Sequence, residues 1–283
     1  MSDNAISVLA PAKLNLFLHI LGRRNDGYHN LQSLFQLLDF GDDLHFETDT
    51  SGTISLHLDS NSEIKKIPMD DNLIIRATEL LRANYGRNQL GASITLTKRI
   101  PIGSGLGGGS SNAAATLKAL NKLWNCGLEK QELATMGLEL GADVPVFVWG
   151  KSAWAEGVGE RLEAIEIEPC WYLVINPNSI VSTAQIFSQE NLTRNSPAIK
   201  MADFLEGTAR NDCESVTRKL HPEVDQAFEI LARFADFRMT GTGSSLFASF
   251  SSEAAAKEVL NALPDNLPGF VAKGIDSLEQ DYS

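Results

Sequence analysis

Apolar and polar residues alternate along the first part of the chain, which is the pattern of a β-strand with one buried face. The clearest case is the segment 7–21. One face of this segment carries Leu14, Leu16, Leu18 and Ile20, and the other carries Lys13, Asn15, Phe17 and His19. A polar turn follows at 22–30, and we predict further strands over 31–39, 44–48 and 53–58. The last two form a meander, with turns at 41–43 and 51–52.

Helical spacing of apolar residues first appears at 72–85 and returns at 131–140, where the helix ends at Gly141. Strands and helices are mixed in the remainder of the chain. We predict strands over 92–97, 144–149, 152–156, 171–175, 237–240, 246–250 and in the tail, and helices from Ser182 and over 204–213, 224–235 and 253–262. This mixture predicts an α+β fold with two layers rather than regular alternation of strand and helix.

Five glycines lie between positions 103 and 109. Glycine loses more conformational freedom on folding than any other residue, so such a cluster indicates a backbone that must closely approach something else. An alternating strand precedes it, and an Ala-rich helix follows, with Ser110, Ser111 and Asn112 as suitable N-cap residues. A strand, a glycine loop and a helix start present N–H groups and a positive helix end to one point, which predicts a phosphate site.

Other phosphate loops fit this segment less well. No Lys follows the glycines, which excludes a Walker A loop. Gly103, Gly105 and Gly108 satisfy the dinucleotide pattern, but the preceding strand alternates instead of being apolar on both faces. A protein-kinase loop requires Val where Ser110 stands, and the chain has no His-Arg-Asp or Asp-Phe-Gly. A flexible linker is disfavoured because the loop runs directly into a capped helix.

Composition narrows the function classes. The chain has 283 residues, 43% of them hydrophobic, which is enough for one large or two ordinary domains. A net charge of −12 disfavours nucleic acid and anionic membranes as partners. The wide spacing of the three cysteines disfavours a disulfide framework or a zinc site. With no signal-peptide pattern and no long apolar run, we expect a soluble cytoplasmic protein.

Two charged residues lie within apolar segments. Lys13 shares a strand face with Asn15 and is either an exposed edge-strand lysine or a cation for phosphate or a catalytic carboxylate. Asp143 precedes an apolar run and is either a turn or cap residue or a buried carboxylate that needs a partner. A contact between the two at about 4 Å would be worth roughly 4 kcal/mol at an effective dielectric of 20 and would keep the aspartate ionised.

Three further segments have both a structural and a functional interpretation. Tyr28 and His29 end a polar turn; taken alone this is a solvated turn, although the two rings could also hold a base. Thr183 is explained by helix capping. The glycine cluster 241–244 is either a second loop on the phosphate side or an ordinary turn.

Together these segments resemble the three motifs of the GHMP kinases, the small-molecule kinases that include galactokinase, homoserine kinase and mevalonate kinase. The motifs are matched, in order, by residues 11–16, 101–112 and 239–245. Within the family, residues 22–32 and 141–147 resemble the members that phosphorylate 4-diphosphocytidyl-2-C-methyl-D-erythritol in non-mevalonate isoprenoid biosynthesis. The Asp-Gly-Tyr-His segment, residues 26–29, is the discriminating part, and no main motif position departs from the pattern.

The resemblance implies a two-domain fold. Its N-terminal domain, residues 1–160, is similar to the second domain of ribosomal protein S5 and carries ATP binding and catalysis. Its C-terminal domain, residues 161–283, is ferredoxin-like, and the active site lies between the two. We expect a monomer or weak homodimer that uses ATP, with Mg²⁺ carried by the nucleotide and Ser111 as the one suggested protein contact.

The resemblance also implies roles for individual residues. Asp143 is the expected general base, and Lys13 the residue that orients it and stabilises transferred charge. The acceptor is expected to contact Asn15, Tyr28, His29, Thr183, Phe187 and Gly241, with the Tyr28 and Phe187 rings enclosing the cytosine. The ATP phosphates are expected to contact Pro101, Ile102, Gly103, Ser104, Gly105, Leu106, Gly107, Gly108, Gly109, Ser110 and Ser111.

Three alternative functions are disfavoured by particular residues. A family member acting on mevalonate, homoserine or a sugar has no need of the aromatic pair at 28–29. A ligand sensor without catalysis has no need of both Lys13 and Asp143. A nicotinamide dehydrogenase requires an apolar strand ending in an acidic residue about 20 positions after the loop, and Glu129 does not follow such a strand.

Overall fold

The computed structural model describes residues 4–62, 64, 71–85 and 89–278. The strands are β1 Ala5–Arg23, β2 His29–Asp49, β3 Ile54–Leu58, β4 Gly91–Thr97, β5 Ala153–Gly157, β6 Arg161–Ala164, β7 Trp171–Ile175, β8 Arg238–Met239, β9 Leu246–Phe250 and β10 Gly269–Ile275. The helices are α1 Leu73–Tyr85, α2 Gly108–Leu123, α3 Lys130–Leu140, α4 Val144–Trp149, α5 Thr183–Ser188, α6 Met201–Leu205, α7 Glu214–Leu220, α8 Pro222–Leu231 and α9 Glu253–Ala262.

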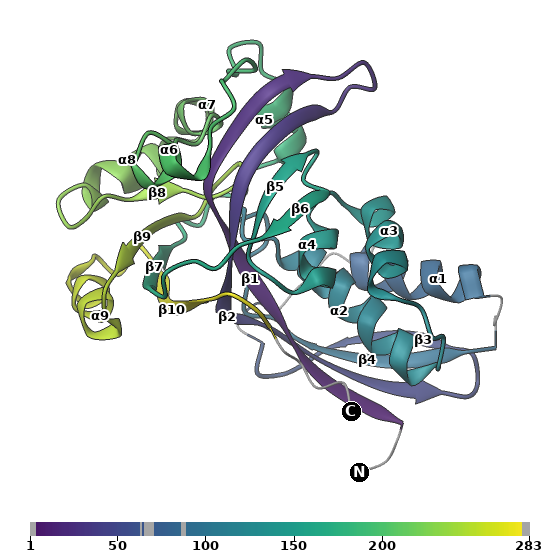
Figure 1. Cartoon of the computed structure of the whole chain (residues 1–283). Helices are drawn as coiled ribbons and strands as arrows, with labels where there is room; N and C mark the ends of the chain where they lie inside the picture. Colours follow the sequence, from purple (N-terminus) through teal and green to yellow (C-terminus); the bar gives the residue numbers. More distant parts are fainter. Residues whose placement is uncertain (1–3, 63, 65–70, 86–88, 279–283) are drawn as a thin grey trace.

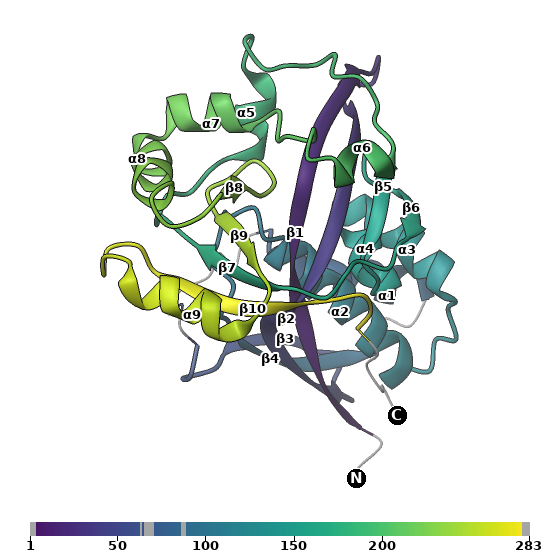
Figure 2. The same ribbon diagram turned by 60° about the vertical axis from the view of Figure 1, so that its left-hand side comes forward.

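Strand β2 is central to the architecture. It pairs with β1 along most of its length, with β4 over Asp43–Asp49, with β5 near its start and with β10 at Leu37–Leu38. The sheet order is therefore β3-β4-β2-β10-β7-β9-β8, and β1 and β2 cross the whole molecule in both ribbon views (Figures 1 and 2). This single strand connects the N-terminal strands and helices to the C-terminal ones.

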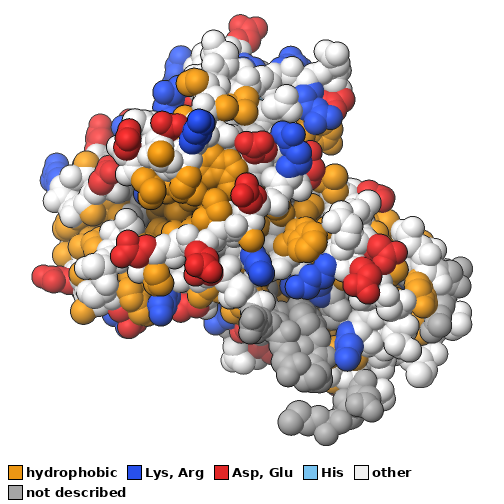
Figure 3. Space-filling view, in the orientation of Figure 1, with side chains coloured by type: hydrophobic (Ala, Val, Ile, Leu, Met, Phe, Trp, Pro, Cys, Tyr) orange, Lys and Arg blue, Asp and Glu red, His pale blue; other side chains and the backbone are white. Residues whose placement is uncertain are grey.

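The buried apolar side chains form three clusters: one in the N-terminal part, one in the C-terminal part, and a third that includes Leu14, Phe17 and Leu34 of β1 and β2. In the N-terminal part, α1, α2 and α4 bury apolar side chains against β2 and β4. In the C-terminal part, α7, α8 and α9 pack with β7 and β9. On the face shown in Figure 3, acidic and basic side chains are interspersed, and hydrophobic ones gather over the C-terminal half. Among the described residues, no helix is both long enough and apolar enough to span a bilayer.

Strand β2 differs from the prediction. The turn expected at 41–43 is absent, because the chain stays extended from His29 to Asp49. No meander forms either: β3 pairs in parallel with β4, and β4 lies between β3 and β2. A Gly-Asp-Asp sequence usually forms a turn, but here Asp42 finds hydrogen-bond partners on other elements and remains within the strand.

Two more element predictions are wrong. Residues 144–149, predicted as a strand, form helix α4, because a short apolar run buried on every side has no periodicity that distinguishes strand from helix. The helix predicted over 204–213 ends at Leu205, and α7 begins only at Glu214. Helix α2 begins at Gly108, before the predicted caps, with Gly107 in the N-cap position.

Candidate active site

Three segments that are far apart in sequence converge beside β1. The backbone N–H of Lys13 donates to the Leu106 carbonyl at 3.0 Å, which attaches the glycine loop to β1. The N–H of Asn15 donates to Thr240 Oγ1 at 2.8 Å, and the N–H of Ser245 donates to the Ser104 carbonyl at 3.0 Å. The two glycine loops and the lysine strand are therefore held together by direct hydrogen bonds.

A cavity of about 520 Å³ opens where these segments meet. Its wall includes most of the residues that the sequence analysis assigned to a site. These are Lys13, Asn15, Pro101, Ile102, Gly103, Ser104, Gly105, Gly107, Gly108, Gly109, Ser110, Asp143, Thr183, Phe187 and Gly241. Four assigned residues, Leu106, Ser111, Tyr28 and His29, are not part of this wall.

Two glycines of the loop cannot be replaced without displacing backbone or a neighbouring ring. Gly105 has a φ of +79°, and a Cβ atom there would lie 2.5 Å from the Thr240 carbonyl oxygen. Gly107 has a φ of +76°, and its Cβ would lie 2.8 Å from the Phe147 ring and 3.1 Å from Lys13 Cε. The loop thus follows a left-handed path that glycine favours, in close contact with the other parts of the site.

Lys13 and Asp143 form an ion pair in the cavity wall. The Lys13 Nζ lies 3.3 Å from Asp143 Oδ2 and donates a hydrogen bond to Asn15 Oδ1. Lys13 is only 3% exposed, so it is not an edge-strand lysine in solvent. The Asp143 side chain is 34% exposed, which leaves it accessible from the cavity.

Asp143 occupies the N-cap position of α4 but does not act as a cap. Its side chain makes no capping hydrogen bond to the helix. Pro145 in the first turn of α4 has no N–H to be capped, which reduces the need for one. The carboxylate is therefore available to pair with Lys13 across the cavity.

Helix α5 contributes Thr183 and the aromatic ring of Phe187 to the cavity wall. Thr183 is the first residue of α5, and Ser182, not Thr183, accepts the capping hydrogen bond. Phe187 packs against His29, with ring centroids 5.0 Å apart. His29 thus lies directly behind Phe187, whereas Tyr28 is 63% exposed at the end of the β1–β2 hairpin.

Arg194 fixes this aromatic pair. Its Nε donates to His29 Nε2 at 3.1 Å, and its Nη2 donates to the Phe187 carbonyl at 2.8 Å. Burial lowers the pKa of His29, and the positive charges of Arg194 and Arg23 lower it further. His29 is therefore held as a neutral ring at neutral pH.

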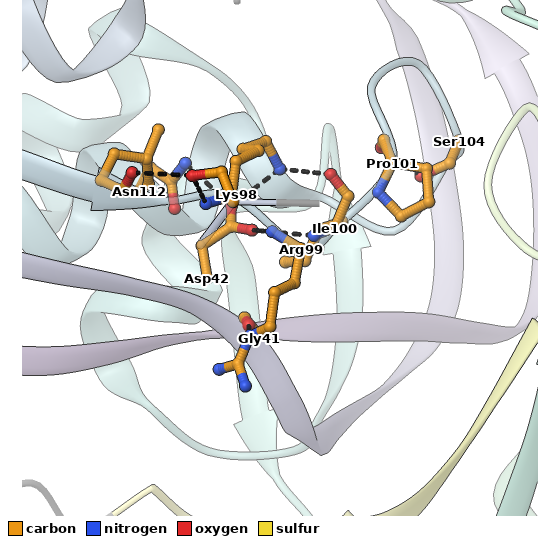
Figure 4. Close-up of polar contacts among 10 residues, drawn as sticks. Gly41, Asp42, Lys98, Arg99, Ile100, Pro101, Ser104 and Asn112 are labelled. Carbon is orange, nitrogen blue, oxygen red and sulfur yellow. Dashed lines mark hydrogen bonds and ion pairs between the residues drawn. The ribbon is translucent and has the colours of Figure 1, made fainter. Parts of the chain in front are cut away.

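Sequence reasoning missed the buried polar cluster next to the glycine loop. Lys98 is 5% exposed, lines the cavity and pairs at 2.8 Å with Asp42, a carboxylate with no exposed surface (Figure 4). Asn112, at the start of α2, also donates to Asp42 at 3.0 Å. The sequence feature that could have indicated this cluster is Lys98, a lysine at the end of the predicted strand 92–97 and just before the glycines.

The described residues contain no group of three or more His, Cys, Asp and Glu side chains that could hold a metal ion. Ser111, the suggested magnesium contact, is buried, and its hydroxyl has no hydrogen-bond partner within the described part of the chain. Asp143 is a carboxylate on the cavity wall itself. Magnesium usually needs only one or two carboxylates when phosphates supply its other ligands. The Ser111 hydroxyl and the Asp143 carboxylate therefore fit an ion that arrives with a nucleotide.

Comparison with known proteins agrees with this geometry. The family description "GHMP kinases N terminal domain" matches residues 72–151, and "GHMP kinases C terminal" matches residues 192–269. A 4-diphosphocytidyl-2-C-methyl-D-erythritol kinase of Pseudomonas paraeruginosa is 55% identical over 95% of this chain and 94% of its own length. The chain belongs to the GHMP kinase family. An Alkalilimnicola ehrlichii protein of the same name is 53% identical to this GHMP kinase over 94% of the chain and 90% of its own length.

Solved structures confirm the predicted GHMP kinase fold. A crystal structure of 4-(cytidine 5'-diphospho)-2C-methyl-D-erythritol kinase superposes with a TM-score of 0.80 and 31% identity, covering 95% of this GHMP kinase and 99% of that chain. Mevalonate kinase of Methanococcus jannaschii superposes with a TM-score of 0.69 and 19% identity, covering 97% and 100%. The second likeness concerns the fold alone.

Proposed function

We propose that this GHMP kinase transfers the γ-phosphoryl group of ATP to the 2-hydroxyl of 4-diphosphocytidyl-2-C-methyl-D-erythritol, a step of non-mevalonate isoprenoid precursor biosynthesis. The observation that carries the proposal is the Lys13–Asp143 ion pair, 3.3 Å long, in one cavity with the glycine loop. Full-length relatives that bear the name of this kinase at 53–55% identity support the choice of acceptor.

The nucleotide phosphates bind along the glycine loop. Residues 101–109 line the cavity apart from the buried Leu106, and α2 starts within them. The first N–H groups of a helix have no partner within the helix and carry a partial positive charge, which favours phosphate oxygens. A magnesium ion bound with ATP would neutralise charge on the phosphates.

Asp143 acts as the general base. Its carboxylate accepts the proton of the acceptor 2-hydroxyl as that oxygen bonds to the γ-phosphorus, and the bond to the β-phosphate oxygen breaks to release ADP. Lys13, 3.3 Å from Asp143, orients the carboxylate and stabilises charge on the transferred group. Phosphoryl transfer depends mainly on positioning and electrostatic stabilisation, and both are available from these two side chains and the loop.

The acceptor occupies the opposite side of the cavity. Asn15, Thr183 and Gly241 contact its polar groups, and the ring of Phe187, backed by His29, supports the cytosine. Tyr28 closes over the other face of the base from the exposed hairpin end. Residues 1–160 then form the ATP-binding and catalytic domain and residues 161–283 the C-terminal domain, in a cytoplasmic monomer or weak homodimer without nucleic-acid or membrane partners.

Phosphorus NMR of reaction mixtures tests the proposal. The purified chain is incubated with ATP, Mg²⁺ and one acceptor at a time: 4-diphosphocytidyl-2-C-methyl-D-erythritol, mevalonate, homoserine or galactose. We expect ADP and a new phosphomonoester resonance with the cytidine-containing acceptor alone. A phosphomonoester formed only with another acceptor would refute the proposed substrate, and no product with any acceptor would refute kinase activity on this panel.

A further inference from the structure

Asp42 is a buried carboxylate that the proposed reaction does not use. It lies in the middle of β2, has no exposed surface and accepts four hydrogen bonds, two on each oxygen. Oδ1 accepts the backbone N–H groups of Arg99 and Ile100, both at 2.8 Å. Oδ2 accepts Lys98 Nζ at 2.8 Å and Asn112 Nδ2 at 3.0 Å.

These four donors come from the two ends of the glycine loop. Arg99 and Ile100 lie where β4 ends and the loop begins, and Asn112 lies in the second turn of α2, just after the loop (Figure 4). Arg99 also donates through Nε to the Gly41 carbonyl at 2.6 Å, which adds a second attachment to β2. One carboxylate therefore holds both ends of the loop on the same strand.

Lys98 extends this contact into the cavity. Its Nζ donates to the Ile100 carbonyl as well as to Asp42, and it lies so near the start of α2 that a Cβ on Gly108 would be 3.3 Å from it. Burial lowers the pKa of Lys98, and the charge of Asp42 opposes that change. Without a partner, a buried ammonium of this kind would be strongly unfavourable.

We infer that Asp42 is a positioning residue for nucleotide binding: it fixes the two ends of the phosphate loop and the Lys98 ammonium in the arrangement that receives the triphosphate. The inference rests on the proposed binding of ATP at this loop. It assigns Asp42 no contact with substrate, because the residue is fully buried and does not line the cavity.

A carboxylate is required at this position, and an amide of the same shape is not sufficient. In Asp42→Asn the amide oxygen can still accept the N–H groups of Arg99 and Ile100. The amide NH₂ would then face two donors, Lys98 Nζ and Asn112 Nδ2. Losing a charge-assisted hydrogen bond and leaving a buried charge unpaired is among the costliest changes a single substitution can make.

The test separates positioning from general destabilisation. Affinity for the non-hydrolysable ATP analogue AMP-PNP with Mg²⁺ is measured by calorimetry for the wild type, Asp42→Asn and the control Ser152→Ala. Ser152 is also fully buried and hydrogen-bonds the N–H of Leu37 on β2 at 2.9 Å, but it is not part of the cavity wall. We expect Asp42→Asn to raise the Kd for AMP-PNP about tenfold or more, and Ser152→Ala to lower the melting temperature with the Kd unchanged.

Steady-state kinetics provides the second readout. In Asp42→Asn we expect the KM for ATP to rise in parallel with the Kd, while the KM for the cytidine-containing acceptor stays within about twofold. The inference would be overturned if folded Asp42→Asn bound AMP-PNP as tightly as the wild type does. It would also be overturned if the KM values for ATP and for the acceptor rose equally. A wild type that does not bind AMP-PNP would instead overturn the proposed function, and the inference with it.

Asn112→Ala keeps the inference testable if Asp42→Asn does not fold. It removes one donor to Asp42 without changing any charge, so we expect a rise of about threefold in the Kd for AMP-PNP, and an unchanged Kd would contradict the inference. Where Asp42→Asn does fold, the double variant shows whether Asn112 acts through Asp42. Effects on the Kd that are less than additive support this, and strictly additive effects contradict it.

Discussion

The two sides of the cavity are built in different ways. The side that we propose for the nucleotide consists of backbone and buried charge: Ser104 is 2% and Lys98 5% exposed, and Asp42 has no exposed surface. The side that we propose for the acceptor consists of side chains from separate segments, among them Tyr28 at 63% exposure and the half-buried Phe187. A triphosphate presents the same groups in every ATP-dependent reaction, so a rigid backbone site suits it. Selection among acceptors requires side chains that differ between enzymes.

The largest effect is expected where the two sides meet. Asp143→Asn should lower kcat by about 100- to 10,000-fold, because the amide cannot accept the proton, while the affinity for ATP changes little. Asp265→Asn, an exposed carboxylate in the turn before β10, is the control and should leave kcat unchanged. Turnover of Asp143→Asn near that of the wild type would remove this residue from the role of base.

The substitution Gly107→Ala tests the proposed nucleotide side. The new Cβ would press on the Phe147 ring and Lys13 Cε at a φ of +76°, so we expect kcat/KM for ATP to fall about 100-fold. Gly207→Ala is a matched control, since Gly207 also has a φ of +76° but no atom within 4 Å of its Cβ. Equal losses of activity in the two variants would show that backbone strain, and not the contact, is responsible.

The substitution Tyr28→Ala tests the proposed acceptor side. Loss of a ring stacked on the cytosine should raise the KM for the cytidine-containing acceptor about tenfold and leave the KM for ATP nearly unchanged. Phe234→Ala, another exposed aromatic residue, serves as the control. If both KM values rise equally in Tyr28→Ala, the ring does not belong to the acceptor side and the contrast between the two sides is weakened.

The last effect is on stability and not on activity; it concerns Lys118, which lies on α2 and donates to the Phe147 carbonyl at 3.0 Å. Burial, together with a smaller contribution from the positive charge of Lys130, lowers its pKa from 10.5 to about 8. Between pH 8 and 10.5 the unfolded chain therefore binds more protons than the folded one, so this group makes stability rise with pH, by roughly 3 kcal/mol at most.

Urea unfolding at pH 7, 8, 9 and 10 checks this pH dependence. The free energy of unfolding of the wild type should rise with pH relative to that of Lys118→Met. Lys122→Met, which removes an exposed lysine from the same helix, should retain the wild-type pH dependence. Parallel curves for the wild type and Lys118→Met would show that Lys118 is protonated throughout this range.

The glycine-loop side of the cavity was also the more predictable from sequence. Glycines between an alternating strand and a helix have few structural explanations, and Gly105 and Gly107 take the left-handed conformations that this pattern indicates. The pairing of Lys13 with Asp143 was foreseen because both charges interrupt apolar runs. Residues on hairpin ends carry no such signal, and Tyr28 remains assigned by its resemblance to the family.

Contacts between distant segments explain what the sequence did not predict. Asp42 follows a glycine and reads as a turn residue, yet Lys98, 56 positions later, and Asn112, 70 positions later, hold it within a strand. Similarly, residues 144–149 are helical because α2 and α3 pack against them, which local periodicity does not reveal. In both cases tertiary packing overrode the local preference.

Strand β2 has a consequence for how the molecule unfolds. Because it pairs with β4 in the N-terminal half and with β10 from the end of the chain, neither half has a complete sheet without the other. Denaturant should therefore melt both halves in one cooperative transition, and a fragment ending near residue 160 would leave the edge at Leu37 and Leu38 open to self-association. We therefore expect the two family regions, residues 72–151 and 192–269, to behave as one unit of folding.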